Sequence, residues 1–162
     1  MLKAVIQLGV PMAFLSWFMF SWLYSDGKLS IDADRKTISA NLKEMKKSKQ
    51  EPTDTELGFL YKRWMRFGSG FYGLAALWTL IVSEMLDVYG FMTNFPGFAK
   101  LLQDGIINLL VGFFINQLGN LITAFIWFSY WSKESVVLWV LVAYIGYWLG
   151  IQLAKRGYNK TH

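Results

Sequence analysis

The stretch "SVVLWVLVAYIGYWLGIQLAK", residues 135–155, contains no acidic residue and only one basic residue, at its end. A helix of about 20 apolar residues crosses the hydrocarbon core of a bilayer. Small residues recur within it at four-residue steps, at Gly146, Gly150 and Ala154. Because residues at this spacing share one helix face and small ones let backbones approach closely, we expect a transmembrane helix that packs tightly on another helix.

The composition of the whole chain is typical of a membrane protein. Hydrophobic residues make up 54% of its 162 residues, aromatic residues 18% and charged residues 17%, whereas about 25% of the residues in a soluble domain are charged. The net charge of +5 favours an anionic membrane surface over nucleic acid, because only one short segment is basic. The absence of cysteine excludes disulfides and thiolate metal sites.

Three other stretches are candidates for membrane segments. Residues 2–24 and 69–91 are about as long and apolar as residues 135–155. Residues 105–131 are long for one span and short for two. We expect one long tilted helix there, since the stretch has no proline and an isolated glycine is tolerated; a re-entrant hairpin broken near Gly119 is the alternative. The predicted fold is an all-α integral membrane protein with four transmembrane helices, the third long or re-entrant, and a short cytoplasmic amphipathic helix.

The N-terminal apolar stretch, residues 2–24, has features of a signal peptide, because Lys3 precedes an apolar run. The run is as long as a full span, however, and no cleavage site with small residues follows it, so we expect a retained helix. Pro11 is expected to bend this helix, which membrane helices accept when a neighbouring group satisfies the freed carbonyl.

Most of the basic residues lie in one polar segment, residues 25–68, between the first helix (residues 1–24) and the remaining membrane part (residues 69–162). The positive-inside rule places this segment in the cytoplasm and the N-terminus outside. Four spans would leave the basic tail, residues 155–162, outside as well, whereas a re-entrant third segment would bring it inside. The small size and the lack of an organelle signal favour a bacterial inner membrane.

Residues 30–50 are expected to form the short amphipathic helix, with Ser30 or Asp32 capping its start. Its apolar side chains form one narrow stripe, at Ile31, Ile38, Leu42 and Met45. This stripe would lie on the membrane, bind a partner helix or pack on the protein itself. Lysines clustered beside it favour attachment to anionic lipid headgroups, through Lys46, Lys47 and Lys49.

A second helix is predicted to begin within residues 53–56, "TDTE", which have the pattern of a capping box. The residues that follow mix basic and aromatic side chains, a combination typical of the headgroup region. We therefore expect this helix to anchor the start of the second span at the interface, through Lys62, Arg63 and Arg66 beside Tyr61 and Trp64.

Helical spacing aligns polar and small residues along the third apolar stretch. These residues recur every four positions, at Asn108, Gly112, Asn116 and Asn120. Gly119 lies one residue before Asn120. In hydrocarbon the amides need hydrogen-bond partners, and the glycines let a second backbone approach closely. We expect this stripe to pack against a helix. A path for an ion or small solute is the alternative, since a pore also needs polar side chains.

Two carboxyl groups, Glu84 and Asp87, stand about one helical turn apart on the second apolar stretch. Charged residues within a span are candidates for a cation or proton site. The alternative is that both reach the outer interface by depth alone, since they lie near the end of the stretch.

Residue types needed for most catalysis and cofactor binding are missing. The one histidine is His162, and no glycine-rich phosphate loop or acidic magnesium motif is present. We expect no enzyme activity, no cofactor and no metal. The sequence favours an accessory, assembly or regulatory subunit of a membrane complex, associated with other subunits or with itself. An oligomeric ion channel or small transporter is the alternative, and an enzyme acting on lipids is a third hypothesis.

Overall fold

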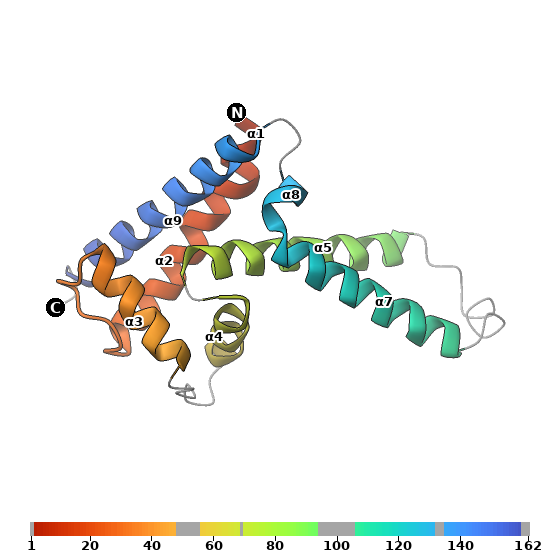
Figure 1. Cartoon of the computed structure of the whole chain (residues 1–162), viewed down its shortest axis with the longest axis horizontal. Coiled ribbons are helices and arrows are strands. Elements are labelled where there is room, and N and C mark those ends of the chain that lie inside the picture. Colours follow the sequence, from red (N-terminus) through yellow and green to blue (C-terminus); the bar gives the residue numbers. More distant parts are fainter. Residues whose placement is uncertain (1, 48–55, 69, 94–105, 132–134, 160–162) are drawn as a thin grey trace.

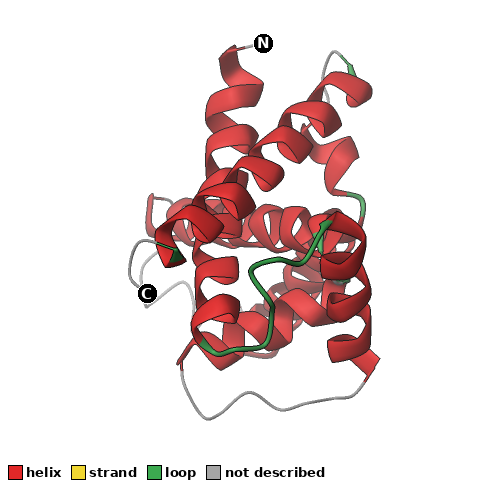
Figure 2. Cartoon of the chain, turned by 90° about the vertical axis from the view of Figure 1, so that its left-hand side faces the viewer, coloured by secondary structure: helices red, strands yellow, loops and turns green. Residues whose placement is uncertain are grey.

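The computed structural model of the chain describes residues 2–47, 56–68, 70–93, 106–131 and 135–159. These residues form helices and no strand (Figures 1 and 2). The helices are α1 (Leu2–Ala4), the π-helical turn η1 (Val5–Gly9), α2 (Val10–Ser25), α3 (Arg35–Lys47), α4 (Glu56–Phe67), α5 (Phe71–Thr93), α7 (Ile106–Phe125), α8 (Trp127–Trp131) and α9 (Val136–Tyr158).

Three helical segments are long and apolar enough to cross a membrane: the continuous run Leu2–Ser25, α5 and α9, of 24, 23 and 23 residues. The predicted all-helical class is confirmed, and these segments are compatible with an integral membrane protein. The predicted count of four spans is not confirmed, because residues 110–125 of α7 form only a shorter apolar helix.

The glycines of α9 bring it into close contact with α2. A Cβ added to Gly150 would lie 2.7 Å from both the Ser16 Cβ and the Trp17 backbone nitrogen, and one added to Gly146 would meet the backbone of Gly9. At the same crossing, the buried Ser16 hydroxyl donates a hydrogen bond to the Tyr147 carbonyl, at 2.7 Å. The closest helix pair in the fold therefore depends on small residues, as expected of packing in lipid.

Helices α2 and α9 run in the same direction (Figure 1). Near their ends, the rings of Tyr24 and Tyr158 lie 6.5 Å apart. The end of α9 also contacts the basic segment, because the Lys155 amine donates to the Ala33 carbonyl at 2.6 Å. The start of the tail therefore lies beside the basic segment, whereas four crossings would leave the two on opposite sides of the membrane. Hydropathy alone gives the length of a span but not which helices are neighbours.

Pro11 acts as expected, and the structure shows which group compensates for it. Proline lacks an N–H, so the carbonyl of Gln7, four residues earlier, loses its helical donor. The indole N–H of Trp78 in α5 donates to this carbonyl at 3.0 Å. The turn immediately before is the π-helical η1, in which the Val10 N–H donates to the Val5 carbonyl. The main-chain hydrogen bonding of the first span is thus irregular where Trp78 of α5 contacts it.

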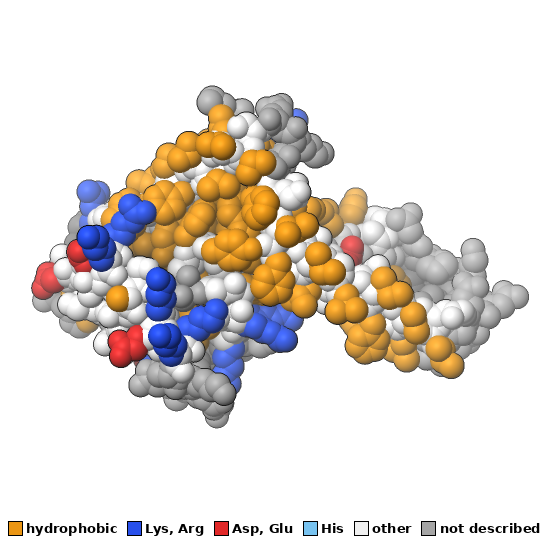
Figure 3. Space-filling view, in the orientation of Figure 1, with side chains coloured by type: hydrophobic (Ala, Val, Ile, Leu, Met, Phe, Trp, Pro, Cys, Tyr) orange, Lys and Arg blue, Asp and Glu red, His pale blue; other side chains and the backbone are white. Residues whose placement is uncertain are grey.

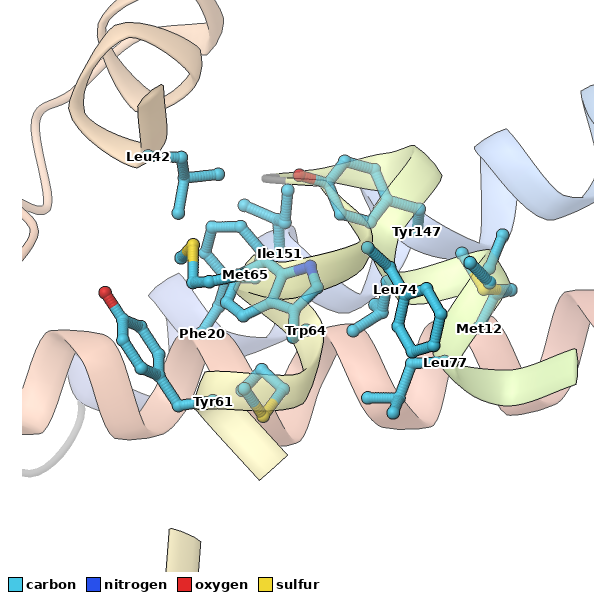
Figure 4. Packing of buried hydrophobic residues seen from close by; sticks show 14 of the residues in the cluster. Met12, Phe20, Leu42, Tyr61, Trp64, Met65, Leu74, Leu77, Tyr147 and Ile151 are labelled. Carbon is cyan, nitrogen blue, oxygen red and sulfur yellow. The ribbon is translucent and has the colours of Figure 1, made fainter. Parts of the chain in front are cut away.

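Aromatic side chains of α4 lie in the core of the fold. Trp64 is completely buried and Tyr61 nearly so, and burial raises the pKa of Tyr61. Trp64 packs edge-on against Phe20 of α2, with ring centroids 5.9 Å apart (Figure 4). Tyr61 and Trp64 therefore pack inside the protein, because α4 folds back onto α2 and α5 and buries its aromatic face. Their depth at the headgroup layer stays a prediction.

A tight turn joins α4 to α5. Gly68 and Gly70 have φ values of +141° and +88°, which side-chain-bearing residues rarely adopt. The indole N–H of Trp64 donates to the Gly70 carbonyl at 3.0 Å, and Gly73 lies so close to Gly68 that a side chain would meet the backbone. Helix α4 begins at Glu56, the last residue of the predicted capping box; Thr53 lies outside the described residues.

Helix α3 starts one turn later than predicted and packs on its own chain. Asp34, rather than Ser30 or Asp32, caps it: its Oδ1 accepts from the Thr37 N–H at 2.8 Å. Hydrogen bonds from the Thr37 side chain and backbone lower the pKa of Asp34. Ile38 and Leu42 are buried. Of the predicted alternatives for this apolar stripe, packing on the protein itself is what the structure shows for Ile38 and Leu42, whereas Ile31 and Met45 are half-buried.

The third apolar stretch is interrupted at Ile126, where α7 ends and α8 turns away (Figure 1). The hydroxyl of Tyr72 donates to the Phe125 carbonyl, and the Ser129 N–H donates instead to the Ile126 carbonyl, at 2.8 Å. A single helix over residues 105–131 was therefore not the correct prediction. A break near Gly119 was not correct either, because α7 continues through this residue. The hydroxyl of Tyr72, which belongs to α5, takes the place of the main-chain N–H that would otherwise donate to the Phe125 carbonyl.

Candidate functional site

Helices α5 and α7 lie antiparallel and form an arm at a steep angle to the α2–α9 pair (Figures 1 and 2). One side of α7 faces α5, where Ala124 is buried and Gln117 and Leu121 are half-buried. Most other described side chains of α7 are exposed, including Phe114 at 63% and Ile122 at 61%. Figure 3 shows hydrophobic side chains along this arm. The arm therefore exposes a large apolar surface, as expected of a helix surrounded by lipid or a partner.

The predicted amide stripe lies on this exposed surface. Asn108, Gly112, Asn116 and Gly119 are exposed. A side chain added to Gly112 or Gly119 would meet no atom within 4 Å. Within the described residues, no other helix therefore covers the two glycines of the stripe. These glycines leave an open strip of helix surface beside the exposed amides.

Asn120, the last member of the predicted stripe, has a different position. Its side-chain N–H donates to the Asp87 carboxylate of α5 at 2.7 Å. It therefore holds α7 onto α5 and is not part of the open strip. A helix turns by about 100° per residue, so Asn120 points about 40° beyond Asn116, toward the side that faces α5.

Glu84 and Asp87 do not form a common site. Glu84 faces α4 and pairs with Arg63 at 3.4 Å, whereas Asp87 accepts from Asn120 of α7. Each carboxylate therefore has its own partner on a different helix. The described residues contain no group of three or more acidic or histidine side chains that would hold a metal ion. The geometry favours helix anchoring for both carboxylates over the predicted cation or proton site.

The second predicted stripe, on α9, is buried by contacts within the same chain. Gly146 and Gly150 form the contact with α2, and Ala154, one turn further, is 1% exposed. The chain thus has two stripes of similar spacing with different surroundings. One is closed by another helix of the chain, and the one on α7 is open.

Lysine and arginine side chains gather around α3 and α4, at the end where α2 and α9 finish (Figure 3). Lys46, Lys47, Lys62 and Arg66 are exposed there. Arg63 is partly exposed and paired with Glu84, and Lys49 lies outside the described residues. This position is suited to contact with anionic headgroups, which remains a prediction for these side chains.

Several residues that position the helices were not found by sequence reasoning. Trp78 and Tyr72 donate to main-chain carbonyls of other helices, and the Trp131 indole donates to the Thr79 hydroxyl at 2.8 Å. The only signal was the high aromatic content, which gives no indication of partners. Each bond joins residues more than 50 positions apart, so no local pattern predicts it.

Comparisons of the chain with protein-family models, curated proteins and solved structures find no match. The functional argument therefore depends on the geometry of the chain alone.

Proposed function

We propose that this protein is a non-catalytic membrane subunit that assembles with a further transmembrane helix, from a partner protein or a second copy, through the open strip of α7. The strip consists of Asn108, Gly112, Asn116 and Gly119. The observation that carries the proposal is the open space at both glycines on an otherwise apolar helix. In the same chain, the two glycines of the α9 stripe, Gly146 and Gly150, are covered by a helix.

The energetics favour a helix as the occupant of this strip. An amide in hydrocarbon gains about 0.6–2 kcal/mol when it hydrogen-bonds across a helix interface. Glycines beside it add close backbone packing, which is the main attraction between helices in lipid. A water-filled path would satisfy the amides but does not need glycines. Assembly therefore accounts for both residue types, and a channel or small transporter accounts for one.

We propose further that the chain crosses the membrane three times. Two helices that cross in the same direction, as α2 and α9 would, require an odd number of crossings between them, and α5 provides one. Residues 106–131 would then enter and return on the same side. The break at Ile126 supports this, because α7 ends there and the short helix α8 follows with a different direction (Figure 1). The basic end would be cytoplasmic, in a bacterial inner membrane.

Single cysteines test this topology cleanly because the native chain has none. In intact cells, cysteines at Ser30 and Asn159 are expected to stay unlabelled by a membrane-impermeant maleimide, and both should react after lysis. A cysteine at Ser135, the residue before α9, should react without lysis. Labelling at Asn159 but not at Ser30 in intact cells would contradict the three-crossing arrangement and support four crossings.

Substitutions on the strip test the assembly proposal. Gly112→Leu is expected to reduce complex formation at least tenfold, because a bulky side chain separates the backbones. Asn116→Ala should reduce it less, by roughly fivefold, since one amide hydrogen bond contributes about 1 kcal/mol. The measurement is the oligomer or complex fraction by native mass spectrometry in mild detergent, complemented by disulfide cross-linking of single cysteines along α7. Cross-links should occur at positions 108, 112, 116 and 119.

Gly90→Leu is the matched control, since Gly90 is also a helical glycine with open space around it, but on α5. It should leave assembly unchanged. Assembly that survives Gly112→Leu, together with altered ion flux in liposomes for Asn116→Ala, would refute the packing proposal and support the channel.

A further inference from the structure

A small crevice lies between α3, the start of α5 and the second half of α9. Its volume is about 160 Å³, well below the roughly 300–1,000 Å³ of sites for drug-sized ligands. The side chains that define its chemistry are Arg35, Ser39, Phe71, Tyr144, Tyr147 and Trp148. This combination is one cation with hydroxyl and aromatic groups, and the lining contains no carboxylate.

Arg35 is held at the mouth of this crevice. Its guanidinium carbon lies 4.9 Å from the centre of the Tyr144 ring, a cation–π contact that joins α3 to α9. Within the described residues, the ion pairs do not include Arg35. A guanidinium stacked on a ring keeps its N–H edges available, and these match the oxygens of a phosphate. Arg35 therefore presents a fixed cation to an anionic group.

The remaining lining suits an amphiphilic anion. The Ser39 hydroxyl can donate a second hydrogen bond beside Arg35, since both residues lie on α3 one helical turn apart and line the crevice. The half-buried side chains of Phe71 and Trp148 add apolar surface to the lining. A ligand with a phosphate at one end and hydrocarbon at the other would therefore satisfy both parts of the crevice.

The position of the crevice also indicates a lipid. It lies where α3 covers the second half of α9, and lysine and arginine side chains gather around α3 (Figure 3). Exposed side chains of α9 in the same part of the helix are hydrophobic, including Leu141, Ile145 and Leu149. A headgroup in the crevice would thus have its acyl chains in the surrounding bilayer.

We propose that this crevice binds the phosphate headgroup of an anionic phospholipid, with Arg35 as the principal phosphate contact and Ser39 as the second donor. This site is separate from the strip on α7, so it does not depend on the proposed assembly. A specifically bound headgroup would hold α3 against α9 and couple the basic segment to the membrane.

The test uses the full chain, delipidated in a neutral detergent and titrated with phosphatidylglycerol or phosphatidylcholine by native mass spectrometry. Phosphatidylglycerol should bind more tightly. Arg35→Gln should weaken its binding roughly tenfold, as expected for a charged hydrogen bond. Lys36→Gln is the matched control, because it removes the same charge from the adjacent exposed position, and it should change binding less than twofold. Arg35→Lys should also weaken binding, since a lysine lacks the planar fork.

Equal effects of Arg35→Gln and Lys36→Gln would indicate diffuse attraction and overturn the site, as would an unchanged affinity in Arg35→Gln. Inorganic phosphate is the further probe: if millimolar phosphate displaces the lipid and binds as tightly, the ligand is free phosphate and the lipid proposal fails. Should Arg35→Gln not fold, Ser39→Leu fills the crevice from an exposed position without changing charge. Unchanged lipid binding in Ser39→Leu would also overturn the proposal.

Discussion

Replacing Gly150 by leucine is expected to abolish the folded protein. A Cβ at this position would already lie 2.7 Å from the Ser16 Cβ and from the Trp17 backbone nitrogen, and it would meet the Ala13 carbonyl. Most of these atoms belong to backbone, so the side chain fits only if α2 and α9 separate. Separation would also break the buried hydrogen bond from Ser16 to Tyr147. We expect no folded monomer by size-exclusion chromatography in detergent.

The smaller change Gly150→Ala makes this effect measurable. It should lower the free energy of unfolding by about 3 kcal/mol, at the upper end of the usual cost of overpacking. Unfolding in mixed detergent, followed by tryptophan fluorescence, gives this value. Gly157→Ala is the control on the same helix, because a Cβ there would meet no atom within 4 Å. Equal unfolding midpoints for the two alanine variants would contradict the proposed contact.

Gly73→Ala is expected to detach α4 from α5. The added Cβ would lie 2.6 Å from the Gly68 carbonyl carbon and 2.9 Å from the Trp64 carbonyl oxygen, both of which are backbone atoms. The turn would have to open, and Trp64 would lose its hydrogen bond to the Gly70 carbonyl. We expect a loss of about 3 kcal/mol, a red shift in tryptophan emission and faster proteolysis within α4.

Gly90→Ala is the matched control for this substitution, since it is the same change on the same helix in open space. It should leave emission and proteolysis unchanged. Both glycines have helical backbone, so helix propensity affects the two variants alike, and any difference between them reports the contact. If Gly73→Ala keeps native emission and native protease resistance, the close approach of Gly68 and Gly73 is not required by the fold.

Local features of this fold could be predicted from the sequence. Helix α3 lies inside the predicted residues 30–50, and α4 begins at the predicted capping box. The apolar stretches gave the three candidate spans within a few residues. The compensated carbonyl at Pro11 was also expected, although not its donor. These features depend on residues within a few turns of one another, which is the range over which periodicity and capping act.

The candidate site could be predicted only in part. The spacing of Asn108, Gly112, Asn116 and Gly119 identified one helix face, and the structure shows that face open. Spacing did not reveal that Asn120 binds Asp87, or that Glu84 pairs with Arg63. The partners of a carboxylate depend on which helix lies beside it. Arg35 was not identified for the same reason, because its ring partner is Tyr144, far along the chain.

The sequence by itself determined the class of the protein, because hydrocarbon solvation depends on the length and composition of each helix and not on its neighbours. Only the tertiary structure decided that α2 and α9 run in the same direction, that the tail lies beside the basic segment and that Trp64 is buried. An apolar side chain is equally suited to lipid and to the protein interior, so hydropathy does not distinguish them. Contacts between distant residues make this choice: Gly9 with Gly146, Thr79 with Trp131 and Tyr72 with Phe125.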